Sequence, residues 1–238
     1  MRAKRKGDEK AMVVGVDGCR EGWVCFFVAM RSRKTSVRFL PTIKKLLGLV
    51  PNPKVIAVDI PIGLVEFEAR SCDVAARRLL GKPRSSSVFP APIRSVLSAA
   101  SYEKACRIAR LKHGKALSKQ SDALRPKIRE VDVVITQRKQ GWVREVHPEV
   151  CFWAMNNKQP MKHKKSSTQG REERLAILRK YFSAIDSHLA ELRGKCHSHD
   201  VIDAAAAAWT AVRLVNGEAK TVSDPELDRK GLRMEIVY

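Results

Sequence analysis

Four aspartates stand at the ends of the most regular apolar segments of the chain. Asp17 follows the run V-V-G-V, and Asp59 closes the run K-V-I-A-V-D. Asp200 and Asp203 are three residues apart at the start of an alanine-rich segment, so they share one face of a helix formed there. If the two apolar runs are neighbouring parallel strands, Asp17 and Asp59 meet at one sheet edge, where α/β proteins tend to keep their functional groups. The spacing therefore predicts one cluster of four carboxylates, provided that the helix crosses the sheet.

Such a cluster suits hydrolysis of phosphodiester bonds with divalent cations. Carboxylates hold two cations about 4 Å apart in two-metal sites, and oxygen ligands suit Mg²⁺ or Mn²⁺. We expect Asp17, Asp59, Asp200 and Asp203 to be metal ligands and catalytic residues of a two-metal site. Three of them also have a structural interpretation: Asp200 as the N-cap of a helix, and Asp17 and Asp59 as turn formers. Since a basic protein gains nothing from clustered negative charge without a metal, the four together favour the functional interpretation.

Other polar residues are expected around this cluster. Glu149 is a candidate fifth ligand or general base, or else a first-turn glutamate favoured by the helix dipole. His199 is next to Asp200 and is expected to assist metal or water, whereas the segment C-H-S-H before Asp200 lacks the four-ligand spacing of a zinc site. The expected substrate-binding residues are Arg20, Ser85, Ser86, His147, Lys164, Lys165, Arg171 and Arg174, which offer donors to phosphate oxygens. For the lysines alone, a solvated surface is the alternative.

The charge of the chain points to a polyanionic partner. Its 238 residues include 46 Lys and Arg against 25 Asp and Glu, which gives a formal net charge of +21. Such a field attracts nucleic acid at fast, salt-sensitive rates, although a generally basic proteome or a general contribution to solubility would also explain the charge. Aromatic content of 6% gives little support to a stacking platform for single strands. The sequence has no apolar stretch long enough to span a membrane and no signal peptide, so we expect a cytoplasmic protein with no membrane partner. It also has no C-x-x-C pair, so we expect its cysteines to be reduced and mostly buried.

The elements that must position the acids follow from periodicity. We expect a disordered basic tail over residues 1–10 and a single domain over 11–238, with a basic helical insertion at about 82–140. Strands are predicted at 11–30 (a hairpin turning at residues 17–22), 35–40, 54–59 and 144–147. Helices are predicted at 43–50, 72–80, 171–181 and 200–215, with a Pro- and Ser-rich loop at 81–92. This order predicts an α/β fold whose mixed sheet has three antiparallel strands followed by parallel strands, flanked by helices.

Five motifs in this order resemble a known family. They are V-G-V-D-G-C-R-E-G-W-V, A-V-D-I-P-I-G-L, S-S-V-F-P-A-P-I-R, E-V-H-P-E and H-D-V-I-D-A-A-A-A-A-W-T-A, spanning about residues 13–215. Together they resemble a largely uncharacterised family of predicted RNase H-like nucleases. The resemblance implies a ribonuclease H-like fold and divalent-metal nuclease activity, although function is inherited less safely than fold.

The pair Asp200 and Asp203 also looks like the last acids of Holliday-junction resolvases, which share that fold. By this analogy Asp17 is the central ligand and Asp59 the second. Ribonuclease H enzymes often carry a glutamate on the helix after the third strand, and residues 42–50 contain none. The resolvase-like set is therefore the better template, and cleavage of RNA–DNA hybrids is not implied.

The sequence is also compatible with two other functions. One is a nucleic-acid-binding protein that kept the fold without catalysis. The other is an actin-like or sugar-kinase-like phosphotransferase, because D-G-C-R after the first strand loosely fits a phosphate-binding hairpin. A second glycine-rich phosphate loop is absent, which disfavours the phosphotransferase. DNA or RNA as substrate and the oligomeric state, a homodimer included, are left open.

Overall fold

Five strands form one mixed sheet at the centre of the molecule. The structure is a computed structural model that describes residues 11–238; the expected tail at 1–10 lies outside the described residues. The strands are β1 (Met12–Cys19), β2 (Gly22–Ala29), β3 (Thr35–Leu40), β4 (Val55–Asp59) and β5 (Val143–Glu145), in the spatial order β3-β2-β1-β4-β5. The first three are antiparallel, β4 runs parallel to β1, and β5 runs parallel to β4. The predicted α/β class and ribonuclease H-like sheet are confirmed.

The apolar runs form the central strands because both faces of the sheet are covered. Val13, Val14 and Val16 of β1 are fully buried, which is typical of a strand with helices on both sides. The hairpin differs from the prediction in one respect. Asp17 was expected to start the turn, but β1 continues to Cys19 and Asp17 pairs with Val24 of β2. Asp17 is therefore fixed by strand pairing, which leaves only Arg20 and Glu21 between the strands.

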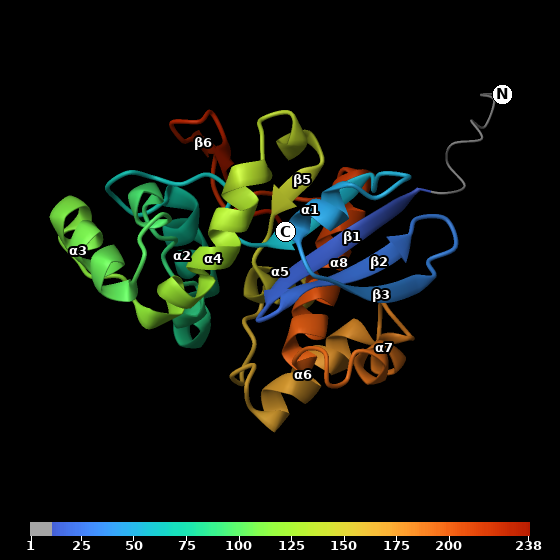
Figure 1. Cartoon of the computed structure of the whole chain (residues 1–238). Coiled ribbons are helices and arrows are strands. Elements are labelled where there is room, and N and C mark those ends of the chain that lie inside the picture. Colours follow the sequence, from blue (N-terminus) through green and yellow to red (C-terminus); the bar gives the residue numbers. More distant parts are fainter. Residues whose placement is uncertain (1–10) are drawn as a thin grey trace.

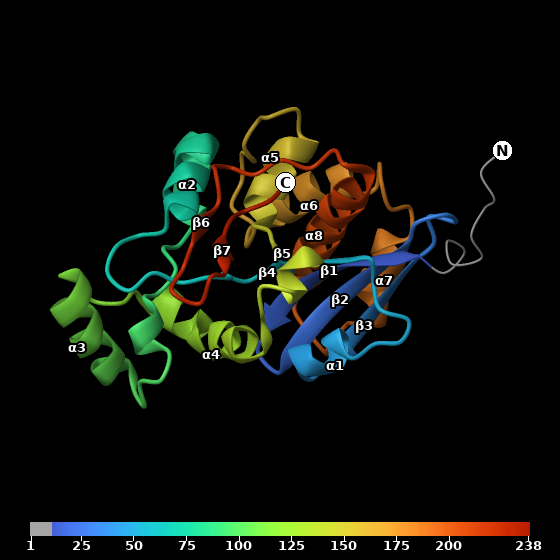
Figure 2. The ribbon, with the colours of Figure 1, turned by 90° about the horizontal axis from the view of Figure 1, so that it is seen from above.

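Helices cover the two faces of the sheet unequally (Figure 2). One face carries α5 (Pro148–Met155), α6 (Thr168–Leu178), α7 (Ile185–Glu191) and α8 (Ser198–Asn216); the other carries α1 (Ile43–Leu47) and α4 (Lys119–Val134). Val13 and Phe26 belong to the core with the alanines of α8, whereas Val14 and Val16 belong to the core with Ile128 of α4. The alternation of side chains along β1 thus supplies both cores.

The helix α8 lies unusually close to the sheet, and Gly15 of β1 allows this. A Cβ atom at Gly15 would lie 2.0 Å from the carbonyl oxygen of Ala204 and 2.0 Å from the nitrogen of Ala208. Only glycine on the strand and alanine on the helix permit backbones to approach to this distance. Because α8 contacts β1, β4 and β2, its position relative to the strand ends is determined by this contact.

The chain between β4 and β5 is mostly helical. It contains α2 (Ser71–Arg84), the 3₁₀ turns Ser85–Ser87 and Arg94–Val96, α3 (Tyr102–His113), α4 and the 3₁₀ turn Lys139–Gly141. The expected helix at 72–80 lies within α2, whose helical geometry is interrupted at Gly81 and Lys82. Figure 1 shows α3 at the outer edge of the molecule, with α4 between it and the sheet.

The remaining predicted elements are present with shifted ends. The helix expected at 43–50 ends at Leu47, and α6 begins three residues before the predicted helix because Ser167 accepts a hydrogen bond from the Gly170 nitrogen. The short strands β6 (Glu226–Leu227) and β7 (Arg233–Met234) form a separate antiparallel pair. All six cysteines are free and five are buried, as expected. In the described part of the chain, no helix is long and apolar enough to cross a membrane.

Candidate functional site

The two strand aspartates lie directly beside each other. In the parallel pairing of β1 with β4, Asp17 and Asp59 are register partners at the carboxyl end of both strands. Both line a cavity of about 650 Å³ at this edge of the sheet. The strand order places them together, because β4 lies next to β1 in the sheet, as the sequence predicted.

The first two turns of α8 bring the second pair of acids to the same cavity. Asp200 and Asp203 both line it, and their side chains are 7% and 2% exposed. Asp200 is not the N-cap; that position belongs to His197, whose backbone nitrogen donates to Asp200 Oδ2 at 2.8 Å. The other carboxylate oxygen of Asp200 lies 3.2 Å from His199 Nε2. Asp200 therefore stabilises the start of the helix and still faces the cavity.

Burial and nearby negative charge raise the pKa of three of the carboxyls, those of Asp17, Asp59 and Asp200. Burial, followed by the charges of Asp59 and Asp203, raises the pKa of Asp17 well above its ordinary value. Burial, followed by Asp203, raises the pKa of Asp59 to about 8. Burial also raises the pKa of Asp200, against the opposing effect of His199. Carboxyls that repel one another in a buried site are stabilised as anions by an added cation.

Lys165 supplies one cation to the cluster. Its Nζ lies 2.7 Å from Asp203 Oδ2, and this carboxylate, followed by Asp17 and Asp59, raises the pKa of Lys165 against the opposing effect of partial desolvation; its side chain is 48% exposed. The segment that carries Lys165 is held by Glu173, whose carboxylate accepts from the backbone nitrogens of Lys162 and His163. The predicted residues Lys164 and Lys165 both line the cavity.

Glu149 lies at the cavity, but one of its oxygens is committed to structure. Its Oε1 accepts from Arg174, which is 1% exposed and also donates to the carbonyl oxygens of Gly170 and His163. Burial raises the pKa of Glu149, and Arg174 opposes this. Glu149 Oε2 is buried without a hydrogen-bond partner. Arg174 was predicted to bind substrate, and this is wrong: its guanidinium is enclosed and anchors Glu149.

Of the other residues predicted to bind substrate, some line the cavity and others lie outside it. His147 and Ser86 line the cavity. Burial, followed by Lys165, lowers the pKa of His147 to about 4, and its Nδ1 accepts from the Glu149 nitrogen. Ser85 is adjacent to the lining residues without being one of them. Arg20 is exposed in the β1–β2 turn, outside the lining of the cavity.

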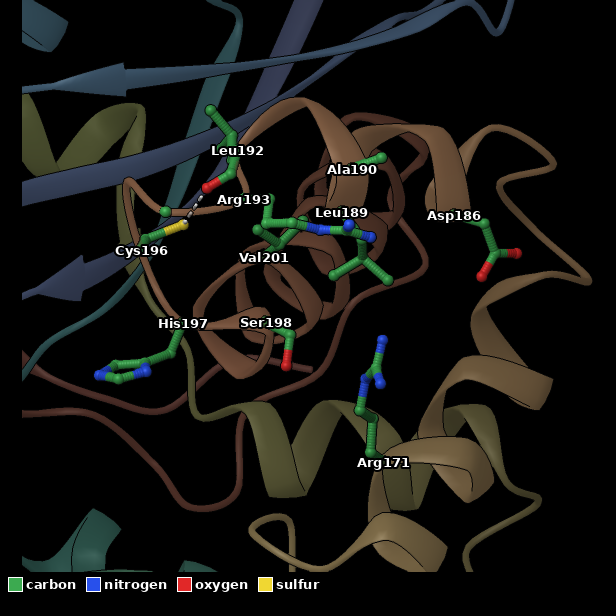
Figure 3. A pocket seen from close by; sticks show the side chains of 11 residues that line it. Arg171, Asp186, Leu189, Ala190, Leu192, Arg193, Cys196, His197, Ser198 and Val201 are labelled. Carbon is green, nitrogen blue, oxygen red and sulfur yellow. Dashed lines mark hydrogen bonds between the residues drawn. The ribbon is translucent and has the colours of Figure 1, made fainter.

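Arg171 lies in a different pocket. A pocket of about 300 Å³ is lined by residues of α6, α7, the segment before α8 and the start of α8, including Leu189, Arg193 and Val201. Figure 3 shows the guanidinium of Arg171 pointing into this pocket from α6. The acids of the main cavity are not among its lining residues. Arg171 is therefore separated from the cluster that it was predicted to serve.

An ion network beneath the acids is the main feature that the sequence analysis missed. Glu145 accepts from Arg70 at 2.7 and 2.8 Å, and Arg70 also donates to Asp73. All three are buried and line the cavity. Burial raises the pKa of Glu145 to about 7, against the effect of Arg70. The motif E-V-H-P-E contained Glu145, but its partners are 75 and 72 residues away, and no local pattern indicates them.

The donor set suits a hard divalent cation. It consists of the four aspartates and Glu149, which are oxygen donors of the kind that Mg²⁺ and Mn²⁺ prefer. The unpartnered Glu149 Oε2 and the mutual repulsion of the aspartates both fit an added positive charge. Within residues 11–238, however, no group of three or more His, Cys, Asp or Glu side chains is arranged so that it could hold a metal ion. The carboxylates share a cavity without forming a compact ligand set.

Comparison with known proteins gives one family. Over residues 15–227 the chain matches the family described as "Protein of unknown function (DUF429)". Neither the curated proteins nor the solved structures gave a match.

Proposed function

The chain belongs to the DUF429 family, and we propose that it is a nuclease that hydrolyses phosphodiester bonds with Mg²⁺ or Mn²⁺. One observation carries the proposal: Asp17 and Asp59 are register partners, and Asp200 and Asp203 of α8 line the same cavity. Carboxylate oxygens are the donors that two-metal phosphodiester hydrolysis uses, and these four line one cavity on an RNase H-like sheet.

The acids would hold the cations, and each is positioned by a different element. Asp17 and Asp59 are held by strand pairing, Asp200 and Asp203 by the close contact of α8 with Gly15, and Glu149 by Arg174. Bound divalent ions would activate a water molecule and stabilise the leaving oxygen. The five carboxylates would orient the bound cations, and the buried ion pair of Arg70 and Glu145 lies beside the end of β4.

Basic residues would bind the phosphate backbone. Lys164, Lys165 and Ser86 line the cavity and offer donors to phosphate oxygens. Burial lowers the pKa of His147 to about 4, so near neutral pH it is a neutral imidazole, and its Nδ1 accepts from the backbone nitrogen of Glu149 and caps the start of α5. Exposed cations of α3, including Arg107 and Arg110, would extend the contact along the strand.

The five sequence motifs also support this function. The cavity contains the acids of four motifs that resemble the predicted RNase H-like nucleases, and Ser86 and Phe89 come from the fifth. The resolvase-like arrangement, with a pair of acids on the last long helix, is the closer analogy.

The test is a cleavage screen of the wild type and Asp17→Asn on labelled single-stranded, duplex, hybrid and four-way-junction substrates. With Mg²⁺ or Mn²⁺ we expect products from the wild type and a loss of at least 100-fold in the variant. Asparagine is neutral and nearly isosteric, so the variant retains the fold while losing a cation ligand. Asp224→Asn is the matched control, because Asp224 is exposed and does not line the cavity.

Each other outcome would reject the proposal. Cleavage at the wild-type rate by Asp17→Asn would show that Asp17 is not a catalytic residue. Salt-sensitive binding without any metal-dependent cleavage would favour a non-catalytic nucleic-acid-binding protein. Thermal stabilisation by ATP with no cleavage would favour the phosphotransferase.

A further inference from the structure

The cavity that contains the acids also has an apolar wall. Besides the carboxylates it is lined by Val88, Phe89, Ala123 and Leu124, which come from the loop after α2 and from α4. Phe89 and Leu124 are 43% and 36% exposed, although both are large and apolar. A hydrolytic site that contacts only the sugar–phosphate backbone has no need of such a surface. The wall therefore indicates that an apolar part of the substrate enters the cavity.

The loop that carries Phe89 is held in place on both sides. The carbonyl oxygen of Val88 accepts from Arg77 at 3.3 Å, and that of Pro90 accepts from Ser121 of α4 at 3.1 Å. The nitrogen of Ala91 donates to Asp73 at 2.9 Å. Because Asp73 belongs to the buried network with Arg70 and Glu145, the position of the loop is coupled to the strand end of the acid site. Phe89 is thus presented at low entropic cost to a partner.

The size of the cavity limits that partner. Its volume of about 650 Å³ falls in the range of roughly 300–1,000 Å³ typical of sites for one small molecule. A base inside a duplex is paired and stacked, so it must leave the helix to enter such a space. A single unpaired nucleotide meets both requirements, because its base is flat and apolar on its faces and its phosphate is an anion.

We propose that this cavity accommodates one unpaired nucleotide of the substrate strand, with its base against Phe89 and Leu124. This inference rests on the proposed nuclease function and names its substrate class: single-stranded, looped or otherwise unpaired nucleic acid. The phosphate of that nucleotide lies toward the acids, next to Lys164 and Lys165, which line the same cavity. Gln120 also lines it and offers an amide that can both donate to and accept from a base edge.

The arrangement differs from an open stacking platform. Few aromatic residues are available in the chain, so successive bases have no row of rings to stack on. One aromatic ring in a confined site suffices for one base, and base–aromatic stacking amounts to about 1–3 kcal/mol, or roughly 5- to 150-fold in affinity. The expected preference is therefore for a single base at one position.

The test measures binding of four nucleoside 5′-monophosphates and of ribose 5-phosphate to the full chain by titration calorimetry in the presence of Ca²⁺. We expect at least one nucleotide to bind about tenfold more tightly than ribose 5-phosphate. Phe89→Ala and Leu124→Ala are each expected to reduce that difference, to about threefold or less for Phe89→Ala. Affinity for ribose 5-phosphate should not change, because it lacks the base.

Phe67→Ala is the matched control. Phe67 is 51% exposed and does not line this cavity, so its replacement should leave the preference for nucleotide intact. Circular dichroism and thermal unfolding of each variant show that the fold is retained. Equal affinities for all five compounds, absence of binding, or an unchanged preference in both cavity variants would overturn the inference.

The outcome is separable from that of the cleavage screen. If Asp17→Asn abolishes cleavage but the five compounds bind equally, the nuclease stands and the base pocket is rejected. If the base preference depends on Phe89 but no substrate is cleaved, the pocket stands and the nuclease is rejected.

Discussion

Arg174 and Glu149 form an ion pair that is almost completely removed from solvent. Their side chains are 1% and 6% exposed, and Arg174 makes two further hydrogen bonds to backbone carbonyls. We predict that Arg174→Ala lowers the free energy of unfolding by about 3–5 kcal/mol, because it leaves a buried carboxylate without its partner. Urea unfolding monitored by circular dichroism measures this change.

Arg171→Ala serves as the control for this prediction. Arg171 lies three residues away on the same helix and is exposed, so its replacement should change stability by no more than about 0.5 kcal/mol. Similar effects of the two substitutions would contradict the structural role of Arg174.

Asp59 makes the stability of the protein depend on pH. Burial and the charges of Asp203, Glu145 and Glu149 raise its pKa from 3.8 to about 8, and Lys165 opposes them. The folded protein therefore holds this proton more tightly than the unfolded chain, so the free energy of unfolding falls as pH rises from about 4 to about 8. Asp59→Asn removes this pH-dependent decrease in the free energy of unfolding, because asparagine does not ionise.

We accordingly predict that, in EDTA, Asp59→Asn unfolds at a higher temperature than the wild type at pH 8 and at nearly the same temperature at pH 4. The gain is about 2–4 °C for each kcal/mol recovered, and differential scanning calorimetry measures it. If the unfolding temperatures of the two proteins differ by the same amount at both pH values, the pKa of Asp59 is not raised by folding.

At the scale of elements, the contact of α8 with β1 decides where the acids lie. An added methyl group at Gly15 meets the backbone of α8 at Ala204 and Ala208, which cannot move aside as a flexible side chain would. We predict that Gly15→Ala lowers the free energy of unfolding by about 3 kcal/mol or more. It also displaces Asp200 and Asp203 from Asp17, so cleavage falls along with stability.

Gly141→Ala is the control that shows whether replacing any glycine by alanine destabilises the protein. No heavy atom lies within 4 Å of a Cβ at Gly141, so the expected change is within about 0.5 kcal/mol. Chemical denaturation of both variants decides the matter. A tolerated Gly15→Ala would mean that α8 does not approach the sheet as closely as described.

At the scale of the whole molecule, the net charge of +21 should govern binding to nucleic acid. Arg107 and Arg110 are exposed on α3, which lies at the outer edge of the molecule (Figure 1). If both contact phosphates, their joint replacement by Gln lowers the slope of log K against log salt concentration by about 2. Fluorescence anisotropy with a labelled strand at several salt concentrations measures the slope.

The charge-matched control replaces Lys44 and Lys45 of α1 by Gln. These residues are exposed on a helix remote from α3 (Figure 1). An equal loss of slope in the α1 variant would show that binding depends on total charge instead of a defined surface.

Local patterns in the sequence determined the elements and the positions of the main acids. Apolar runs predicted β1 and β4, alanines predicted α8, and the order of elements predicted that Asp17 and Asp59 are neighbours. These features are predictable because hydrophobic periodicity and strand burial act over a few residues.

Only the tertiary structure decided which charged side chains reach the acids. Arg174 and Arg171 look equivalent in the sequence, yet one is enclosed beside Glu149 and the other enters a separate pocket (Figure 3). Asp203 is paired with Lys165 across 38 positions, and Glu145 with Arg70 across 75. Such pairings depend on where loops and helices meet in space, and on which charges lose their water there. The physical reason is that burial and long-range contact are properties of the folded chain, which no short stretch of sequence contains.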